Sequence, residues 1–86
     1  MLSSQKVGIG KIIHFYPKIN VAVISLTDML QAGDRILIEG KFTHVEQEVV
    51  SMQIEHVNIQ KAEAGQSIGL KVEGIVREGD TVYKMS

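Results

Sequence analysis

Three histidines are the side chains in this sequence best suited to metal binding or proton transfer: His14, His44 and His56. Imidazole titrates near neutral pH and is a common metal ligand. A metal site also needs further ligands at suitable spacing, yet no HxH or HxxxH pattern occurs and cysteine is absent. We therefore expect these histidines to lie in solvent or at strand edges, and we predict neither a metal site nor a cofactor.

Acidic side chains are the next candidates for chemistry. Glu46 and Glu48 are two residues apart, so they would share one face of a strand, and Glu55 follows nearby. Catalysis by a pair of carboxylates needs a cleft that desolvates one of them, and nothing in the sequence indicates such a cleft. The simpler interpretation is a solvated outer face, and we predict that the chain is not an enzyme.

Basic and aromatic residues offer a possible nucleic-acid contact. Nine basic residues stand against ten acidic ones, so the formal charge of −1 gives no overall attraction for RNA. A local contact remains possible if the loop lysines Lys18, Lys41 and Lys61 bind phosphates while Phe15 and Tyr16 stack on an unpaired base. The alternative for the two aromatic residues is packing at the rim of the fold.

The composition favours strands as the elements that position these residues. Apolar residues make up 44% of the chain and aromatic residues only 5%, so valine and isoleucine dominate the core. Period-two patterns and turn signals predict strands at residues 7–14, 19–26, 35–39, 42–54, 67–72 and 81–84. We expect a β-bulge near Val49–Val50, a short segment at 57–59 and a helical turn within 60–65. Short strands at regular spacing predict an all-β fold, a small closed antiparallel barrel of about six strands.

Alternation within the strands also predicts the core and the turns. Nine residues share the expected inward phase: Ile9, Ile13, Val21, Val23, Ile36, Ile38, Ile68, Leu70 and Val82. The strand at 19–26 is apolar on both faces, which indicates either cover on both sides or an outer patch used for association. Gly33, Gly65 and Gly79 each precede a strand within a polar turn, so we predict positive φ at these glycines.

The length of 86 residues predicts one domain, here residues 7–86 after a flexible N-terminus at 1–6. No apolar run approaches the roughly 20 residues that span a bilayer, and the N-terminus lacks a signal-peptide pattern. We therefore expect a cytoplasmic protein without membrane contact. Nothing in the sequence predicts its oligomeric state.

The order of these turns and strands resembles the second domain of translational GTPases, the β-barrel that follows the GTP-binding domain in elongation factor Tu. The resemblance covers about Val7 to Met85 and rests on Val7-Gly8-Ile9-Gly10-Lys11-Ile12, Leu30-Gln31-Ala32-Gly33-Asp34, Val50-Ser51-Met52-Gln53, Ala62-Glu63-Ala64-Gly65-Gln66-Ser67-Ile68-Gly69-Leu70 and Val76-Arg77-Glu78-Gly79-Asp80-Thr81-Val82. Similar barrels are appended to peptidases of the U32 type, and Ser51-Met52-Gln53-Ile54-Glu55-His56 resembles that version.

The resemblance implies a non-catalytic binding module that contacts RNA (tRNA or ribosomal RNA) or a protein partner. GTP binding does not carry over, because the sequence has no GxxxxGK[ST] phosphate loop. The alternative is a detached accessory domain that serves a separately encoded U32 peptidase-like or RNA-modifying enzyme through protein contacts. In that case we expect the apolar faces of the strand at 19–26 to form the contact surface.

Overall fold

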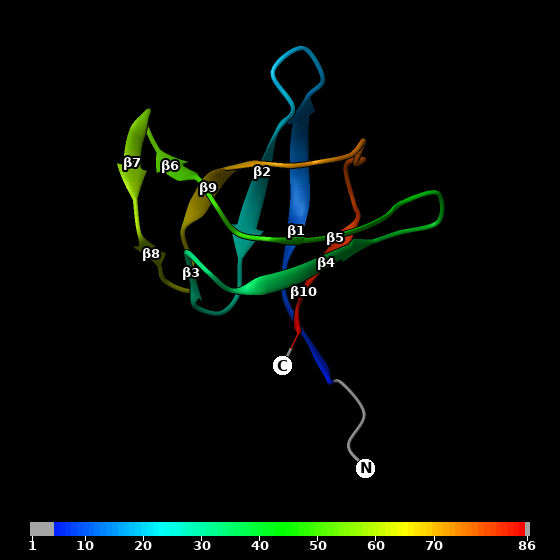
Figure 1. Ribbon diagram of the computed structural model, residues 1–86, viewed down its shortest axis with the longest axis horizontal. Coiled ribbons are helices and arrows are strands. Elements are labelled where there is room, and N and C mark those ends of the chain that lie inside the picture. The colour runs from blue at the N-terminus through cyan, green and yellow to red at the C-terminus, as the bar shows by residue number, and fades with distance from the viewer. Residues whose placement is uncertain (1–4, 86) are drawn as a thin grey trace.

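A computed structural model describes residues 5–85 and shows an all-β fold (Figure 1). Residues 1–4 of the predicted flexible N-terminus, and Ser86, lie outside the described residues. Within residues 5–85 the chain forms strands and no helix. The strands are β1 (Lys6–Tyr16), β2 (Val21–Leu26), β3 (Leu30–Gln31), β4 (Arg35–Glu39), β5 (His44–Glu48), β6 (Met52–Ile54), β7 (Val57–Ile59), β8 (Lys61–Ala62), β9 (Ser67–Lys71) and β10 (Thr81–Met85).

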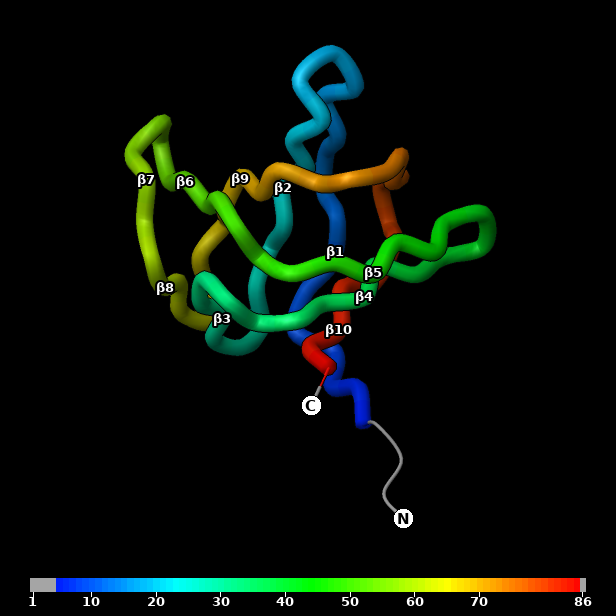
Figure 2. Tube along the Cα trace, viewed as in Figure 1, coloured from blue at the N-terminus to red at the C-terminus, as the bar shows by residue number. Residues whose placement is uncertain are grey.

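Eight of these strands form one antiparallel sheet in the order β5-β4-β10-β1-β2-β9-β6-β7, and β3 pairs with β8 separately. Figure 2 shows how the chain wraps around a common centre, which the buried apolar side chains fill. Hydrogen bonding among the described strands ends at β5 on one side and at β7 on the other. The all-β prediction is confirmed, and closure into a barrel stays a prediction.

A buried glutamine joins β5 to the chain that follows β9. Gln47 is only 3% exposed. Its Nε2 donates to the carbonyl oxygen of Lys71 at 3.0 Å, and its Oε1 accepts from the backbone N–H of Glu73 at 2.7 Å. Because a buried backbone polar group needs a partner, this one side chain replaces two bonds that a neighbouring strand would otherwise supply.

Three turns repeat one pattern of hydrogen bonds. They span residues 31–34, 63–66 and 77–80, with Gly33, Gly65 and Gly79 in third place at φ values of 95°, 92° and 91°. In each turn the fourth N–H bonds the first carbonyl, and the fourth side chain accepts from the first N–H. Positive φ in third place is the requirement of a type II turn. The prediction for all three glycines is confirmed.

The core also follows much of the predicted alternation. Six of the nine predicted core residues are fully buried: Ile9, Ile36, Ile38, Ile68, Leu70 and Val82. The prediction of Ile13 is wrong, because its side chain is 47% exposed while Ile12 is buried. Strand β1 shifts register between Gly8 and Gly10 against β10, and between Ile12 and His14 against β2. These bulges change which residues face inward.

In β2 the alternation is correct and the predicted face is wrong. Ala22, Ile24 and Leu26 are the buried residues, whereas Val21 and Val23 lie half-buried on the outer face. Since both sets are apolar, alternation alone left the choice of face open.

Two predictions about the middle of the chain are also wrong. Residues 42–54 do not form one bulged strand, because β5 and β6 are separated by residues 49–51 and pair with different neighbours, β4 and β9. Val49 leaves the strand to bond the β3–β4 turn, through its N–H to the Asp34 oxygen and its oxygen to the Gly33 N–H. The expected helical turn at 60–65 is instead β8, which pairs with β3.

Candidate functional site

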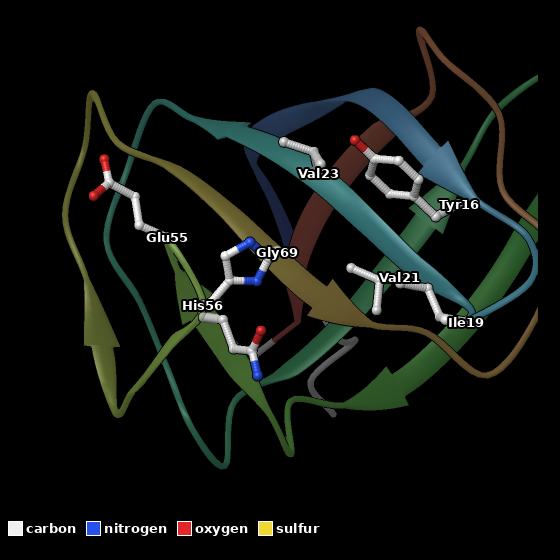
Figure 3. Close-up of a pocket in the computed structure, with 8 residues that line it drawn as sticks. Tyr16, Ile19, Val21, Val23, Glu55, His56 and Gly69 are labelled. Atoms are coloured by element: carbon white, nitrogen blue, oxygen red, sulfur yellow. The ribbon is translucent and has the colours of Figure 1, made fainter.

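A groove of about 440 Å³ lies on the outer face of the sheet (Figure 3). It is bounded by the turn between β1 and β2 on one side and by the tip of the β6–β7 hairpin on the other. The residues that line it are Tyr16, Ile19, Val21, Val23, Gln53, Glu55, His56 and Gly69. The outer side chains of β2 therefore form part of a concave, largely apolar surface.

The floor of the groove depends on a glycine and on incomplete strand pairing. Gly69 in β9 lies opposite Val23 of β2 and opposite Gln53 of β6. Strand β6 pairs with β9 only at Met52–Leu70 and Gln53–Gly69, so the rest of the hairpin has no partner on β9. With no side chain at position 69, the surface there is hollow. A Cβ at this position would lie 3.5 Å from Val21 Cγ1, an ordinary contact distance.

The rim of the groove at the β6–β7 hairpin is a two-residue turn. Its two residues are unusual for the backbone angles that they adopt. Glu55 and His56 have φ values of 50° and 68°, and they connect the paired residues Ile54 and Val57. Positive φ at both positions is the type I′ geometry, which asparagine and glycine normally occupy. Residues with a Cβ cost roughly 1–3 kcal/mol at such angles, and strain of this kind clusters at functional sites.

The opposite rim carries apolar side chains and amines. Tyr16 and Ile19 are 48% and 56% exposed. Beside them, Lys18 lies in the turn, and Lys71 Nζ donates to the Ile19 oxygen at 3.0 Å. A carboxylate thus lies at one end of the groove and ammonium groups at the other. Within the described part of the chain, neither Glu55 nor Lys18 forms an ion pair.

The residues predicted to bind RNA come from three different connections. Lys18 follows β1 and lies next to Tyr16, so the structure brings these two together. Lys41 is in the β4–β5 loop, and Lys61 in β8 is 3.7 Å from a Glu63 oxygen. Phe15 is half-buried against the core. The RNA role of these five residues stays a prediction.

A cluster at the β4–β5 loop was not predicted from the sequence. Phe42 is 71% exposed, with Arg77 Cζ 5.1 Å and Lys41 Nζ 5.7 Å from its ring centre. Both distances fit cation–π contacts. The groove residues Gln53, His56 and Gly69 were also missed. The sequence signal that could have indicated the groove was the strand at 19–26. Its two faces are both apolar, and they cannot both lie in one core.

Most of the other ion pairs lie on open surfaces, whereas Asp80 is buried and its carboxylate accepts from the Arg77 N–H. Lys6 Nζ bonds Glu39 Oε1 at 2.8 Å, and that hydrogen bond raises the pKa of Lys6 and lowers the pKa of Glu39. His44 Nδ1 is 3.6 Å from Glu39, and His14 Nδ1 is 3.3 Å from Glu78. Residues 5–85 contain no group of three side chains placed to hold a metal ion. They also contain no helix long and apolar enough to cross a membrane.

Comparison with known proteins relates the chain to part of larger proteins. No family model matches it. It is 48% identical over 80 residues to an uncharacterized protease of Methanocaldococcus jannaschii, covering 92% of this chain and 20% of the protease. It is 34% identical over 82 residues to a collagenase of Porphyromonas gingivalis, covering 93% of this chain and 20% of the collagenase. The chain therefore spans about one-fifth of the length of these relatives.

Solved structures identify the fold. The C-terminal domain of a proposed U32 peptidase from Geobacillus thermoleovorans matches with a TM-score of 0.82 and 16% identity, over 88% of this chain and 89% of that domain. Its selenomethionine variant matches with a TM-score of 0.83 and 15% identity, over 88% and 96%. The chain has the all-β fold of a U32 peptidase C-terminal domain. The U32 part of the resemblance is supported, and the translation-factor part stays a prediction.

Proposed function

We propose that this chain is a non-catalytic accessory domain of a U32 peptidase-like enzyme and that it acts through protein contacts. The observation that carries the proposal is the 48% identity along 92% of the chain to only one-fifth of a protease. Most of that relative lies outside the match, which leaves ample chain for chemistry elsewhere. The fold of a U32 peptidase C-terminal domain supports the same role.

The chemistry of the groove supports a binding role over a catalytic one. Its ionisable rim residues, Glu55 and His56, are exposed on a hairpin tip. A catalytic carboxylate or imidazole usually depends on burial or a neighbouring charge to tune its pKa. The described residues offer Glu55 no ion-pair partner.

The groove is the surface that we assign to protein contact. Tyr16, Ile19, Val21 and Val23 present apolar side chains beside one another on the outer face of β1, β2 and the turn between them. A contiguous apolar surface bounded by polar residues is typical of an interaction site. Its hollow over Gly69 can accept a side chain from a partner.

RNA contact is the second candidate function, in keeping with the translation-factor resemblance. The observation that favours it is the Phe42 ring, exposed and flanked by Arg77 and Lys41. An aromatic ring beside cations can stack on a base while the cations bind phosphate.

Binding to a purified enzyme separates the two candidates. We would mix the tagged chain with the catalytic part of a U32 peptidase-like protein from the same organism, with and without ribonuclease. We expect a stoichiometric complex that survives ribonuclease and that the triple variant Lys18→Ala, Lys41→Ala, Lys61→Ala still forms. Absence of a complex at tens of micromolar, a concentration that would detect a weak specific contact, would overturn the proposal. Loss of the complex on ribonuclease treatment would favour RNA.

A further inference from the structure

We propose that the groove binds an extended segment of the partner enzyme in which an apolar side chain and a carboxylate lie two residues apart. The inference rests on the proposed function in taking the enzyme as the partner, and it adds the chemistry of the segment that the groove recognises. It follows from a second hollow beside the groove and from an ammonium group whose position there is fixed by a hydrogen bond.

The second hollow continues the groove along β9. Its volume is about 290 Å³. It shares some lining residues with the groove and adds others: the shared ones are Ile19, Val21, Gln53 and Gly69, and the added ones are Ser51 and Lys71. A Cβ at position 69 would lie 3.5 Å from Val21 Cγ1 and 3.8 Å from the backbone oxygen of Gln53, so a side chain there would narrow the passage between the hollows. With glycine at this position, the groove and the second hollow form one trough.

The strand pairing sets the distance between the two hollows. In the groove, Gly69 pairs with Gln53. In the second hollow, Lys71 pairs with Val21, and its backbone N–H bonds the Ser51 oxygen at 3.3 Å. Gly69 and Lys71 are two residues apart, which corresponds to about 7 Å along a strand. A partner segment extended along β9 therefore places side chains i and i+2, which share one face, over one hollow each.

The groove end of the trough fits an apolar side chain. The aliphatic side chains of Ile19, Val21 and Val23 line this end. Figure 3 shows the His56 ring turned towards Gly69 and the Glu55 carboxylate turned away from it. The hollow over Gly69 is thus surrounded mainly by carbon. An apolar side chain of the partner would leave water there together with the side chains that surround it, which favours association.

The other end of the trough fits a carboxylate. Lys71 Nζ donates to the backbone oxygen of Ile19 at 3.0 Å. An ammonium group has three N–H donors, so two remain for a partner. No carboxylate within the described part of the chain pairs with Lys71, and the lining residues of the second hollow include no acidic side chain. Because a charged acceptor makes the stronger hydrogen bond to an ammonium, we expect an aspartate or glutamate of the partner here.

Substitutions at Lys71 test the carboxylate. We would titrate the catalytic part of a U32 peptidase-like protein from the same organism, with ribonuclease present, and record the thermal melting of each variant. Lys71→Glu should bind at least about tenfold more weakly than wild type, because two carboxylates then face each other. Lys71→Arg keeps the charge and should bind within about threefold of wild type, whereas Lys71→Met keeps the apolar stem alone and should lie between these two.

The matched control is Lys41→Glu. It makes the same change of charge in the β4–β5 loop, where Lys41 also lacks an ion-pair partner among the described residues. Its affinity for the enzyme should equal that of wild type. Raising the salt concentration should weaken the wild-type complex more than the Lys71→Met complex, because salt screens the attraction between exposed charges.

A zero-length cross-link identifies the segment itself. A carbodiimide joins an amine to a carboxylate in contact with it: the amide bond forms between Nζ and the carboxyl carbon, and the carbodiimide leaves as a urea that carries the lost oxygen. In the complex, Lys71 should cross-link to an aspartate or glutamate of the enzyme. Mass spectrometry of the digested product locates that residue, and we expect an apolar residue two positions before or after it.

The outcomes are distinct. Weakening by Lys71→Glu, wild-type affinity in Lys41→Glu and a Lys71 cross-link next to such an apolar residue support the inference. If Lys71→Glu lowers the melting temperature, the comparison of Lys71→Met with Lys71→Arg decides, and equal affinities overturn the inference.

A complex that Lys71→Glu leaves unchanged, that Lys41→Glu weakens equally, or that gives no Lys71 cross-link overturns the inference and leaves the proposed function intact. A cross-link to a carboxylate without an apolar residue two positions away also overturns it. Absence of any complex overturns the proposed function, and the inference with it.

Discussion

The two faces of β2 carry similar apolar residues and have different environments. Ala22, Ile24 and Leu26 face inward and are at most 2% exposed. Val21 and Val23 face outward, remain half-buried and line the groove. One face contributes to the free energy of folding, and the other is available for contact with a partner. Apolar character therefore identifies neither role by itself. Whether a residue packs in the core or lines the groove depends on which face of the curled sheet it occupies.

Truncating an inward residue should have the largest effect on the free energy of unfolding. A small effect would contradict the difference between the two faces of β2. Ile24 is fully buried and opposes Ile68 across the β2–β9 pair. We expect Ile24→Ala to lower the free energy of unfolding by about 2–5 kcal/mol, from lost burial and the cavity left behind. Urea denaturation measures this change. The matched outer-face variant Val23→Ala should cost clearly less, and equal costs would show that the two faces do not differ.

Gln47 is one of three buried polar residues in the described part of the chain, with Thr43 and Asp80, and its removal should have the next largest effect on stability. In Gln47→Ala the Lys71 oxygen and the Glu73 N–H lose their partner. Leaving a fully buried polar group unsatisfied costs about 1–3 kcal/mol, and since these two bonds are part-buried we expect a loss near the lower end of that range. Thermal and urea unfolding should both report the loss. An unchanged stability would mean that water replaces the side chain, and that Gln47 does not hold β5 to the segment after β9.

Substitutions at two glycines distinguish residues required for folding from residues that line the contact surface. At Gly65 φ is 92° and no atom lies within 4 Å of an added Cβ, so Gly65→Ala should cost about 1–2 kcal/mol from the backbone angle alone. At Gly69 the backbone is ordinary and an added methyl meets Val21 at 3.5 Å. Gly69→Ala should leave stability within about 0.5 kcal/mol, as surface substitutions usually do.

The methyl group of Gly69→Ala partly fills the hollow of the groove, so this variant should change binding to the proposed enzyme partner while Gly65→Ala does not. Differential scanning calorimetry and a binding titration with the purified enzyme on the same samples separate the two effects. A large loss of stability in Gly69→Ala would place Gly69 with the turn glycines and contradict its assignment to a contact surface.

The smallest effect concerns a paired charge, in contrast with the unpaired charges of the groove. The hydrogen bond from Lys6 lowers the pKa of Glu39. The pair therefore stabilises the folded state above the unfolded pKa of Glu39, and that contribution is lost as the pH falls through the lower folded pKa. In Lys6→Met we expect the pKa of Glu39 to move up towards its usual range. An NMR titration of the side-chain carboxyl carbon measures it, and an unchanged midpoint would show that Lys6 does not bond Glu39 in solution.

The sequence predicted best where local chemistry decides the conformation. Gly33, Gly65 and Gly79 adopt positive φ because each occupies the third position of a turn that the following polar residue closes, and a type II turn requires positive φ there. Strands without bulges, such as the one around Ile36 and Ile38, also followed their alternation.

The sequence predicted poorly where long-range pairing decides. The bulge near Ile13 changes the inward phase of β1, and its sequence signal is weak. In β2 both phases are apolar, so only the position of the strand in the sheet chooses Ile24 over Val23. The strand at 19–26 signalled an outer apolar face, but the full set of groove residues could not be predicted: Tyr16, Glu55 and Gly69 are far apart in sequence and meet only through the strand order.

The bond from Glu73 to Gln47 has a consequence for amide hydrogen exchange. Glu73 lies outside every strand, where amides normally exchange with solvent after small local fluctuations. Its N–H nevertheless bonds the oxygen of a buried side chain anchored in β5. Exchange there requires Gln47 to leave its site, so this amide should exchange much more slowly than those of neighbouring loop residues. Among loop amides, it therefore reports on how often β5 separates from the chain beyond β9.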